Sequence, residues 1–462
     1  MDIPTDEKDW DYTIDVMNAI RGVRLALSIG NTECLEGFKD KIRLLMRNDH
    51  LSDKIAEIVA EWKDPILCQE AMTDLLEKAD RYMSNGDQRD AITALEQARG
   101  IARLAKCDSL RGRTISERLF LARYALAEQL LKTGAKSIQV EHQFELAYAE
   151  WQSLPNDVKH RPDLAKIAEL SINQIQKLGI KAVDEMRKVI VVQSVKPRLY
   201  PEFEDNLRSD RPPLEKWKLF AALPFALTKA DFKRMEDAAK SDIENSIVGC
   251  FQRLRKSCDG RTVARTTVPG RRQPAKEREQ SFAFAFADRY ADRVRTMTSV
   301  VLDHLRALRR VAPLDVEQVA HLVQHSKWIP TGHIHQISLA VYYGEQEQWI
   351  EAVHLLGPQM EAIVRSRLKE VGVRTIHIKE GVTSELGLSS LSESFPHIVA
   401  GPLAFEIQSL FCDQKGSNLR NDIAHGLRND MSFTPSDVLY AWWLTLHLLL
   451  CVEPERNTAD GH

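Results

Sequence analysis

Apolar residues recur every three or four positions through most of this chain, and this periodicity is the feature that most limits what it can fold into. Between residues 114 and 154, apolar side chains at this spacing alternate with polar ones; they include Leu119, Ala122, Leu126 and Leu130. Such a stripe is typical of an amphipathic helix that buries one face. Period-two alternation, the mark of half-buried strands, is scarce. The sequence therefore predicts an all-α fold, and 462 residues can build a substantial apolar core.

A different pattern occurs near the end of the chain. Residues 438–452, which include Trp442, Trp443 and Leu446, are apolar nearly all round. A helix without a polar face has to be covered on every side. We therefore expect this segment to be buried in a helical bundle or in a dimer interface.

Proline clusters and changes in composition predict three parts. Residues 1–195 are expected to form a helical region. Prolines then interrupt the helical pattern, at positions 197, 201, 212 and 213. Residues 196–280 are accordingly expected to hold a Pro-rich connection, helices and a basic loop. Residues 281–462 are expected to form a C-terminal helical domain.

The N-terminal part contains a stretch that weakly resembles one tetratricopeptide repeat. The spacing that carries the resemblance is that of Leu75, Ala79, Tyr82, Ala91, Leu95 and Ala98. Gly86 and Asp87 are expected to form the turn between the two helices of the repeat, and residues 114–154 a second, degenerate pair. One repeat cannot bury its own face. Two interpretations therefore remain open: a surface for a protein partner, or ordinary packing of a helical bundle.

Charge and cysteine usage exclude several classes of protein. The 63 basic and 66 acidic residues give a net charge of −3, so any contact with RNA has to be a local patch. Seven cysteines without a Cys-x-x-Cys pair argue against a disulfide framework and a structural zinc. The acidic N-terminus is unlike a signal peptide, and no apolar run is long enough to span a membrane. These features predict a cytoplasmic protein without a membrane anchor.

Residues 418–426, Asn-Leu-Arg-Asn-Asp-Ile-Ala-His-Gly, are the part of the chain that indicates chemistry. A loop with Asn418 as N-cap is expected to start a helix here, with Arg420 and His425 in its first two turns. Asn421 and His425 are four residues apart and so share a face, and the long side chain of Arg420 can reach the same place. A cluster of this kind at the positive end of a helix would suit a phosphate.

The three side chains suit the cleavage of RNA. The guanidinium of Arg420 could hold a scissile phosphate and stabilise its transition state. The imidazole of His425 could take a proton from a ribose 2′-hydroxyl or give one to a leaving 5′-oxygen. Asn421 could orient the phosphate or set the tautomer of His425. This chemistry needs no metal ion or other cofactor, but it is easiest with two proton-transfer groups, which a homodimer with a twofold axis would supply.

These residues resemble the Arg-Asn-x-x-x-His signature of the HEPN superfamily, all-α domains that include many metal-independent endoribonucleases. The flanking residues 418–427 are similar to a C-terminal HEPN-type domain found behind long helical regions in bacterial proteins of otherwise uncharacterised function. Residues 352–361 followed by Arg365 resemble the first long helix of that domain. The resemblance covers residues 330–452. It implies that Arg420 and His425 are catalytic.

The resemblance also implies a supporting role for Asn421, RNA as the substrate, a dimer with a composite site, and a part in toxin action or antiviral defence. Glu361 and Arg365, four apart on the expected first helix, would form a helix-face ion pair. A second interpretation is that one of them braces Arg420. His333 and His335 lack a third ligand at a suitable spacing, so no metal site is expected there.

The largest local basic excess lies in residues 253–278, with nine basic residues against two acidic ones. Arg271, Arg272 and Lys276 in this stretch are the candidate contacts to an RNA backbone, because Lys and Arg bind phosphates without sequence preference. The segment lacks aromatic residues that could stack on bases, which favours a solvated loop instead.

Three classes of function are consistent with the sequence. The first is a metal-independent endoribonuclease. The second is a non-catalytic helical adaptor or dimerisation module that binds a protein, a nucleotide or RNA. The third is a nuclease restrained by its N-terminal region, for which a fragment from about residue 281 would cleave faster than the whole chain.

Overall fold

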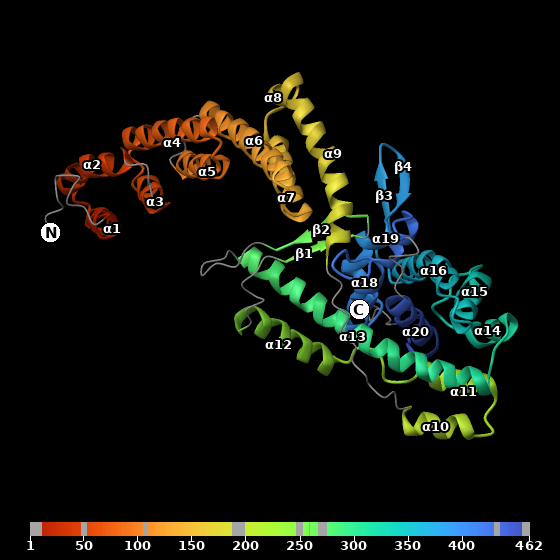
Figure 1. Cartoon of the computed structure of the whole chain (residues 1–462). Coiled ribbons are helices and arrows are strands. Elements are labelled where there is room, and N and C mark those ends of the chain that lie inside the picture. The colour runs from red at the N-terminus through yellow and green to blue at the C-terminus, as the bar shows by residue number, and fades with distance from the viewer. Residues whose placement is uncertain are drawn as a thin grey trace. The chain divides into compact units, whose positions relative to one another are not determined.

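The structure is a computed structural model that describes residues 12–47, 53–104, 109–186, 199–245, 253–257, 259–266, 275–428 and 435–454 (Figure 1). These residues form helices and two small antiparallel hairpins. The all-α class expected from the helical periodicity is therefore confirmed. Among the described helices, none has the length and apolar character needed to cross a membrane.

The chain divides into two compact units, Met1–Arg187 and Lys188–His462. The second unit contains both of the segments that were expected to be separate, 196–280 and 281–462. The short strand considered for residues 189–192 lies outside the described residues.

The first unit is a series of helices that pack mainly against their neighbours in the chain. They are α1 (Tyr12–Ile29), α2 (Thr32–Arg47), α3 (Asp53–Trp62), α4 (Pro65–Asn85), α5 (Gln88–Leu104), α6 (Ser109–Lys132), α7 (Ser137–Ser153), α8 (Asn156–Lys159) and α9 (Pro162–Glu185). Asp64 caps α4 by accepting hydrogen bonds from two backbone amides, and Gly86 ends it in the left-handed conformation, with φ +84°. The turn expected at Gly86 is present, and a second turn with Gly134 at positive φ separates α6 from α7.

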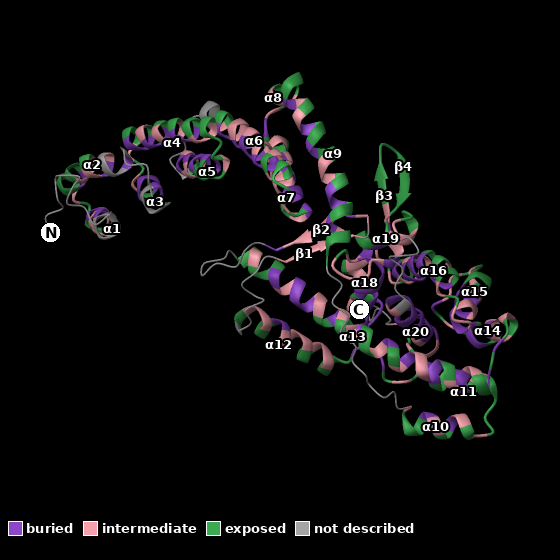
Figure 2. Cartoon of the chain, viewed as in Figure 1, coloured by how far each residue is buried: buried purple, intermediate pink, exposed green. Residues whose placement is uncertain are grey.

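The second unit holds the rest of the helices and both hairpins. In chain order the elements are α10 (Pro201–Arg208), α11 (Pro213–Ala221), α12 (Lys229–Asn245), β1 (Leu254–Lys256), β2 (Thr262–Arg265), α13 (Ala275–Val311), α14 (Val316–Val323), α15 (Ile334–Glu345), α16 (Trp349–Glu370), β3 (Ile376–Lys379), β4 (Val382–Glu385), α17 (Leu388–Leu391), the 3₁₀ helix η3 (Ser392–His397), α18 (Gly401–Phe411), α19 (Leu419–Ala424) and α20 (Pro435–Cys451). Figure 2 shows buried stripes alternating with exposed ones along the long helix α13.

One continuous apolar core joins the helices of the second unit, and α20 is almost wholly buried in it (Figure 2). Trp442 and Trp443 are fully buried, and the indole of Trp442 donates to the carbonyl of Val341 at 3.0 Å. Gly344 makes room for this ring, because a Cβ there would lie 2.2 Å from the indole nitrogen. Of the two alternatives for residues 438–452, a helical bundle or a dimer interface, the bundle is what buries most of the segment, although Cys451 is exposed.

The two hairpins were not expected from the sequence. The strands Leu254–Lys256 and Thr262–Arg265 form an antiparallel pair, so the solvated loop favoured for this basic stretch is wrong at its N-terminal end. Residues 376–385 form a second antiparallel pair. The aromatic residues Phe284 and Phe286, in contrast, are buried on α13, as packing side chains should be.

Candidate functional site

The motif at residues 418–426 forms a short helix and the turn that leaves it. The helix α19 ends at Ala424, so the expectation that His425 lies inside a helix is wrong; His425 is the residue after its end. Asn418 occupies the N-cap position with φ +50°, but its side chain makes no capping bond. With only six residues, α19 offers no extended dipole, and the phosphate site expected at its positive end has no support.

Close contact with α18 sets the start of this segment. Gly416 lies so close to α18 that a Cβ would be 1.9 Å from the carbonyl oxygen of Ser409. Any residue other than glycine would clash with this oxygen. The amide of Ser417 donates to the same oxygen at 2.8 Å. The entry into α19 is therefore fixed by a glycine that the motif itself does not include.

Arg420 is held by a buried carboxylate on α16. Its Nε forms an ion pair with Oε2 of Glu361, while Oε1 of Glu361 accepts a hydrogen bond from Arg365. The helices α16 and α19 pack closely at Gly357, where a Cβ would make an ordinary contact, 3.6 Å from the Cα of Arg420. Both interpretations of Glu361 and Arg365 are thus correct, since the helix-face pair forms and Glu361 also braces Arg420.

Arg365 extends the same network toward the second hairpin. Its Nη2 donates to the carbonyl of Leu386 at 2.9 Å, and its Nε lies 3.3 Å from Oε2 of Glu385 at the end of β4. Glu361, with only 8% of its surface exposed, therefore lies between two guanidinium groups that are each anchored elsewhere. A carboxylate so placed is well compensated, which is the condition for a buried charge.

The Asn421 side chain is fixed by three contacts. Its Nδ2 donates to Oδ1 of Asn418 at 2.8 Å and to Oγ of Ser389 at 3.1 Å. Its Oδ1 accepts from Nη1 of Arg420 at 3.1 Å. Because both donors and the acceptor are engaged by different residues, the amide has one favoured orientation.

A buried ion network lies beside the motif. Arg428 donates to the backbone carbonyl of Ser417 at 2.7 Å and to Asp437 at 2.9 Å, and its Nε lies 3.4 Å from Asp422. Burial opposes the charge of Arg428, but attraction and hydrogen bonds from Asp437 and Asp422 raise its pKa overall. Burial likewise raises the pKa of Asp422, against the attraction of Arg428. This network ties the loop after α19 to the start of α20.

His425 lies at an exposed turn of the chain. Its amide donates to the carbonyl of Asn421 at 3.0 Å, and Gly426 follows with φ +61°. Leu427 then closes the turn by donating to the carbonyl of Asp422 at 2.8 Å. The backbone is therefore well defined, while the imidazole remains accessible to solvent.

A cleft of about 520 Å³ joins the motif to the first hairpin. One side is formed by motif residues, including Asn418, Asn421 and His425, with Arg428 beside them. The other side carries three of the basic residues of the hairpin, Arg255, Lys256 and Arg261. Its size is within the range of about 300–1,000 Å³ usual for ligand sites. Asn421 and His425 thus share one surface, as their spacing predicts.

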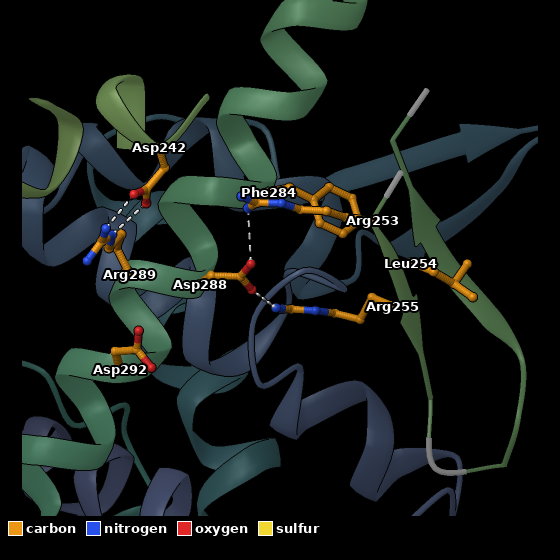
Figure 3. A pocket seen from close by; sticks show the side chains of 8 residues that line it. All are labelled: Asp242, Arg253, Leu254, Arg255, Phe284, Asp288, Arg289 and Asp292. Carbon is orange, nitrogen blue, oxygen red and sulfur yellow. Dashed lines mark hydrogen bonds and ion pairs between the residues drawn. The ribbon is translucent and has the colours of Figure 1, made fainter. Parts of the chain in front are cut away.

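Ion pairs fix the hairpin to α13, as Figure 3 shows. The carboxylate of Asp288 lies 3.3 Å from Arg253 and 2.5 Å from Arg255, two residues that point the same way from β1. Next to this pair, Asp242 of α12 binds Arg289 of α13 at 2.5 Å. These residues line a second cavity of about 570 Å³. Asp288 therefore anchors the hairpin to α13, and Arg255 lines both cavities.

The candidate RNA contacts from the sequence do not coincide with the cleft. Arg271 and Arg272 lie outside the described residues. Lys276 is exposed in the first turn of α13 and is not one of the residues lining the cleft. Basic residues earlier in the same stretch line it instead. The local excess of positive charge was visible in the sequence. The sequence did not show which of these basic residues line the cleft.

Three further residues of the site, Ser389, Arg428 and Asp437, were not predicted from the sequence. The sequence does not show that these residues belong to the site. Ser389 reaches it through the packing of α17, Arg428 through the loop after α19, and Asp437 through the packing of α20. Cys412, beside the motif, is a poor nucleophile because burial raises the pKa of its thiol to about 12. In the part of the chain that the structure describes, no cluster of three or more His, Cys, Asp or Glu side chains suits a metal ion.

Comparison of the chain with protein-family models, with curated proteins and with solved structures gave no match.

Proposed function

We propose that this protein is a metal-independent endoribonuclease of the HEPN type, in which a ribose 2′-hydroxyl attacks the adjacent phosphorus. The observation that carries the proposal is the cleft in which Asn421 and His425 face a wall of basic residues. A polynucleotide needs positive charge along its backbone and a group that moves protons at the scissile phosphate. The cleft offers both within one unit of the protein.

His425 performs the proton transfers in this proposal. The 2′-oxygen loses its proton as it bonds to phosphorus, and the 5′-oxygen gains a proton as its bond to phosphorus breaks. An imidazole can take the first proton or supply the second near neutral pH. The products are a 2′,3′-cyclic phosphate and a 5′-hydroxyl. The exposed position of His425 allows the RNA to reach it.

Arg420 and Asn421 act together on the phosphate. Glu361 holds Nε of Arg420, and Nη1 of the same guanidinium donates to Oδ1 of Asn421. From this position the guanidinium stabilises the negative charge that grows in the transition state, and Asn421 orients the phosphate. Because Glu361 and Ser389 fix these side chains in advance, little ordering remains when the RNA binds.

The active form in this proposal is a homodimer. One copy of the motif holds one imidazole, whereas the reaction has one proton to remove and one to supply. Ala424, His425 and Gly426 are exposed, so a second copy of the chain has access to them. A role in toxin action or antiviral defence is what the resemblance to HEPN proteins implies.

Replacing the imidazole tests the proposal most directly. His425→Ala should lower the cleavage rate roughly 10²- to 10⁴-fold, the usual contribution of a general acid or base, with little change in RNA affinity. The measurement is cleavage of end-labelled RNA in excess chelator, with identification of the product ends. His335→Ala, at an exposed position on α15, is the matched control. Strict dependence on magnesium would contradict the metal-independent mechanism, and no cleavage by the wild-type protein would favour the adaptor instead.

Arg420→Lys should also reduce the cleavage rate, by roughly tenfold or more. An ammonium group keeps the positive charge but cannot contact Glu361, Asn421 and a phosphate with a planar fork of donors. The measurement is the single-turnover rate with saturating protein, with thermal unfolding as a check of the fold. A rate equal to that of the wild-type protein would remove Arg420 from the proposed mechanism.

A further inference from the structure

The β1–β2 hairpin is rich in basic side chains. Its described residues, 253–257 and 259–266, include five of them and the single carboxylate of Asp259. Asp288 of α13 binds Arg253 and Arg255. Three of the basic residues, Arg255, Lys256 and Arg261, line the cleft.

The two basic residues nearest the turn of the hairpin differ in how they are held. Lys256 donates to the carbonyl of Gly260 at 2.9 Å and lies 3.3 Å from the hydroxyl of Thr262, so its ammonium closes the turn. Arg261 forms an ion pair with Asp259 at 2.6 Å, and 58% of its side chain is exposed. An exposed surface pair of this kind contributes little to stability and exchanges its partner readily. Arg261 is therefore available to a phosphate.

The opposite side of the cleft adds a buried cation. The Arg428 side chain is only 9% exposed, and its Nη1 has no hydrogen-bond partner among the residues that the structure describes. A buried donor without a partner is costly and is usually satisfied by a ligand or a water molecule. Arg428 lines the same cleft as Lys256 and Arg261.

We propose that the cleft between the β1–β2 hairpin and the loop after α19 is a subsite for a backbone phosphate next to the scissile one, bound by Lys256, Arg261 and Arg428. This inference rests on the proposed function and assigns the substrate class as single-stranded RNA longer than two nucleotides. The hairpin wall gives affinity without base selection, because its donors reach phosphates rather than base edges. A double helix would have to present its phosphates to a cleft of nucleotide size, whereas a single strand can enter it.

Substrates with different numbers of phosphates separate this subsite from the catalytic one. A dinucleoside monophosphate contains only the scissile phosphate, while a ten-nucleotide RNA also contains its neighbours. Lys256→Gln/Arg261→Gln should lower kcat/KM for the longer RNA by roughly tenfold for each side chain replaced and leave the dinucleoside monophosphate unaffected. Arg261→Gln alone, at an exposed position, should give part of this decrease. Arg208→Gln/Lys218→Gln removes the same charge from exposed positions of α10 and α11 and is the matched control.

A binding measurement separates failure of this inference from failure of the proposed function. The probe is a fluorescent ten-nucleotide RNA with 2′-O-methyl groups, which cannot be attacked, titrated at several salt concentrations. The hairpin variants should bind it more weakly and with a salt slope smaller by roughly 0.7 for each phosphate that is no longer neutralised. Weaker binding of this kind would support the subsite even if the wild-type protein cleaves nothing. Equal effects on both substrates, unchanged binding in the double variant, or no binding by the wild type would overturn it.

Discussion

Among single residues, Glu406 on α18 is the buried carboxyl with the clearest consequence for the pH dependence of stability. It is fully buried, and its Oε2 accepts from the amide of Leu227 at 2.9 Å. Its Oε1 accepts hydrogen bonds from the hydroxyls of Tyr440 at 2.7 Å and Tyr290 at 3.2 Å. These donors favour the carboxylate, but complete burial opposes its charge more strongly. The folded protein therefore favours the neutral acid.

The stability of the protein should consequently fall as the pH rises from about 4.5 to about 7. Burial raises the pKa of Glu406 from 4.5 to about 7. The stabilisation is complete below about pH 4.5, where the unfolded chain is also protonated, and it is lost as the pH rises through 7. The decrease in the free energy of unfolding should amount to about 3 kcal/mol. Urea unfolding between pH 4.5 and 8 measures it, and Glu406→Gln should remove this part of the pH dependence. The same pH dependence in both proteins would contradict the assignment.

Residue spacing predicts local neighbours in the candidate site, but it does not predict partners from distant parts of the chain. Asn418, Asn421 and His425 line one cleft because residues three and four apart face the same way. Glu361 is 59 positions from Arg420, and its contact depends on how α16 packs against α19, which no local pattern encodes. The sequence therefore left its role open between two interpretations. Ser389, which is 32 positions from Asn421, could not be predicted for the same reason.

At the scale of elements, helices were predictable and the hairpins were not. A helix such as α20 repeats its pattern over several turns, whereas β1 has three residues and β2 has four, too few for a period of two to be recognised. The turn residues, in contrast, did carry a signal for hairpins. Asp259-Gly260 is a favoured hairpin dipeptide, and Glu380 and Gly381 both adopt positive φ, as a two-residue turn of type I′ requires.

The anchoring of the first hairpin leads to a prediction at this scale. Asp288→Asn removes the negative charge between Arg253 and Arg255, so the hairpin should separate from α13 more often. Trypsin should then cleave the hairpin several-fold faster. The free energy of unfolding should change by about 1 kcal/mol or less, because the Asp288 side chain is half exposed.

Asp292→Asn is the control for this prediction. It lies one turn further along α13 and lines the same cavity (Figure 3), but its ion pair is with Arg295 of its own helix. In this variant, trypsin should cleave the hairpin at the rate of the wild type. Equal rates in all three proteins would show that the ion pairs with Asp288 do not hold the hairpin in place.

At the scale of the whole molecule, the site and its supports belong to one compact unit. Every residue assigned to the cleft, from Arg255 to Asp437, lies within Lys188–His462. The same unit buries Trp217, Phe220 and Phe225 in one core with α20. A fragment that begins at residue 281 would cut α13 and omit these aromatic side chains together with the first hairpin. It is therefore a poor test of whether the N-terminal region restrains a nuclease.

A fragment of residues 188–462 should fold by itself and retain cleavage of RNA. It keeps the continuous core, the ion pairs of Asp288 and both sides of the cleft, so its urea unfolding should be a single cooperative transition. The 281–462 fragment should unfold without such a transition, because the loss of several fully buried aromatic residues, each worth about 3–5 kcal/mol on truncation, exceeds the stability of a typical domain. Faster cleavage by 188–462 than by the whole chain would assign a restraining role to the first unit. Equal cleavage would leave that unit a partner-binding role. Cooperative unfolding and full activity of 281–462 would contradict the single core on which this division of the molecule rests.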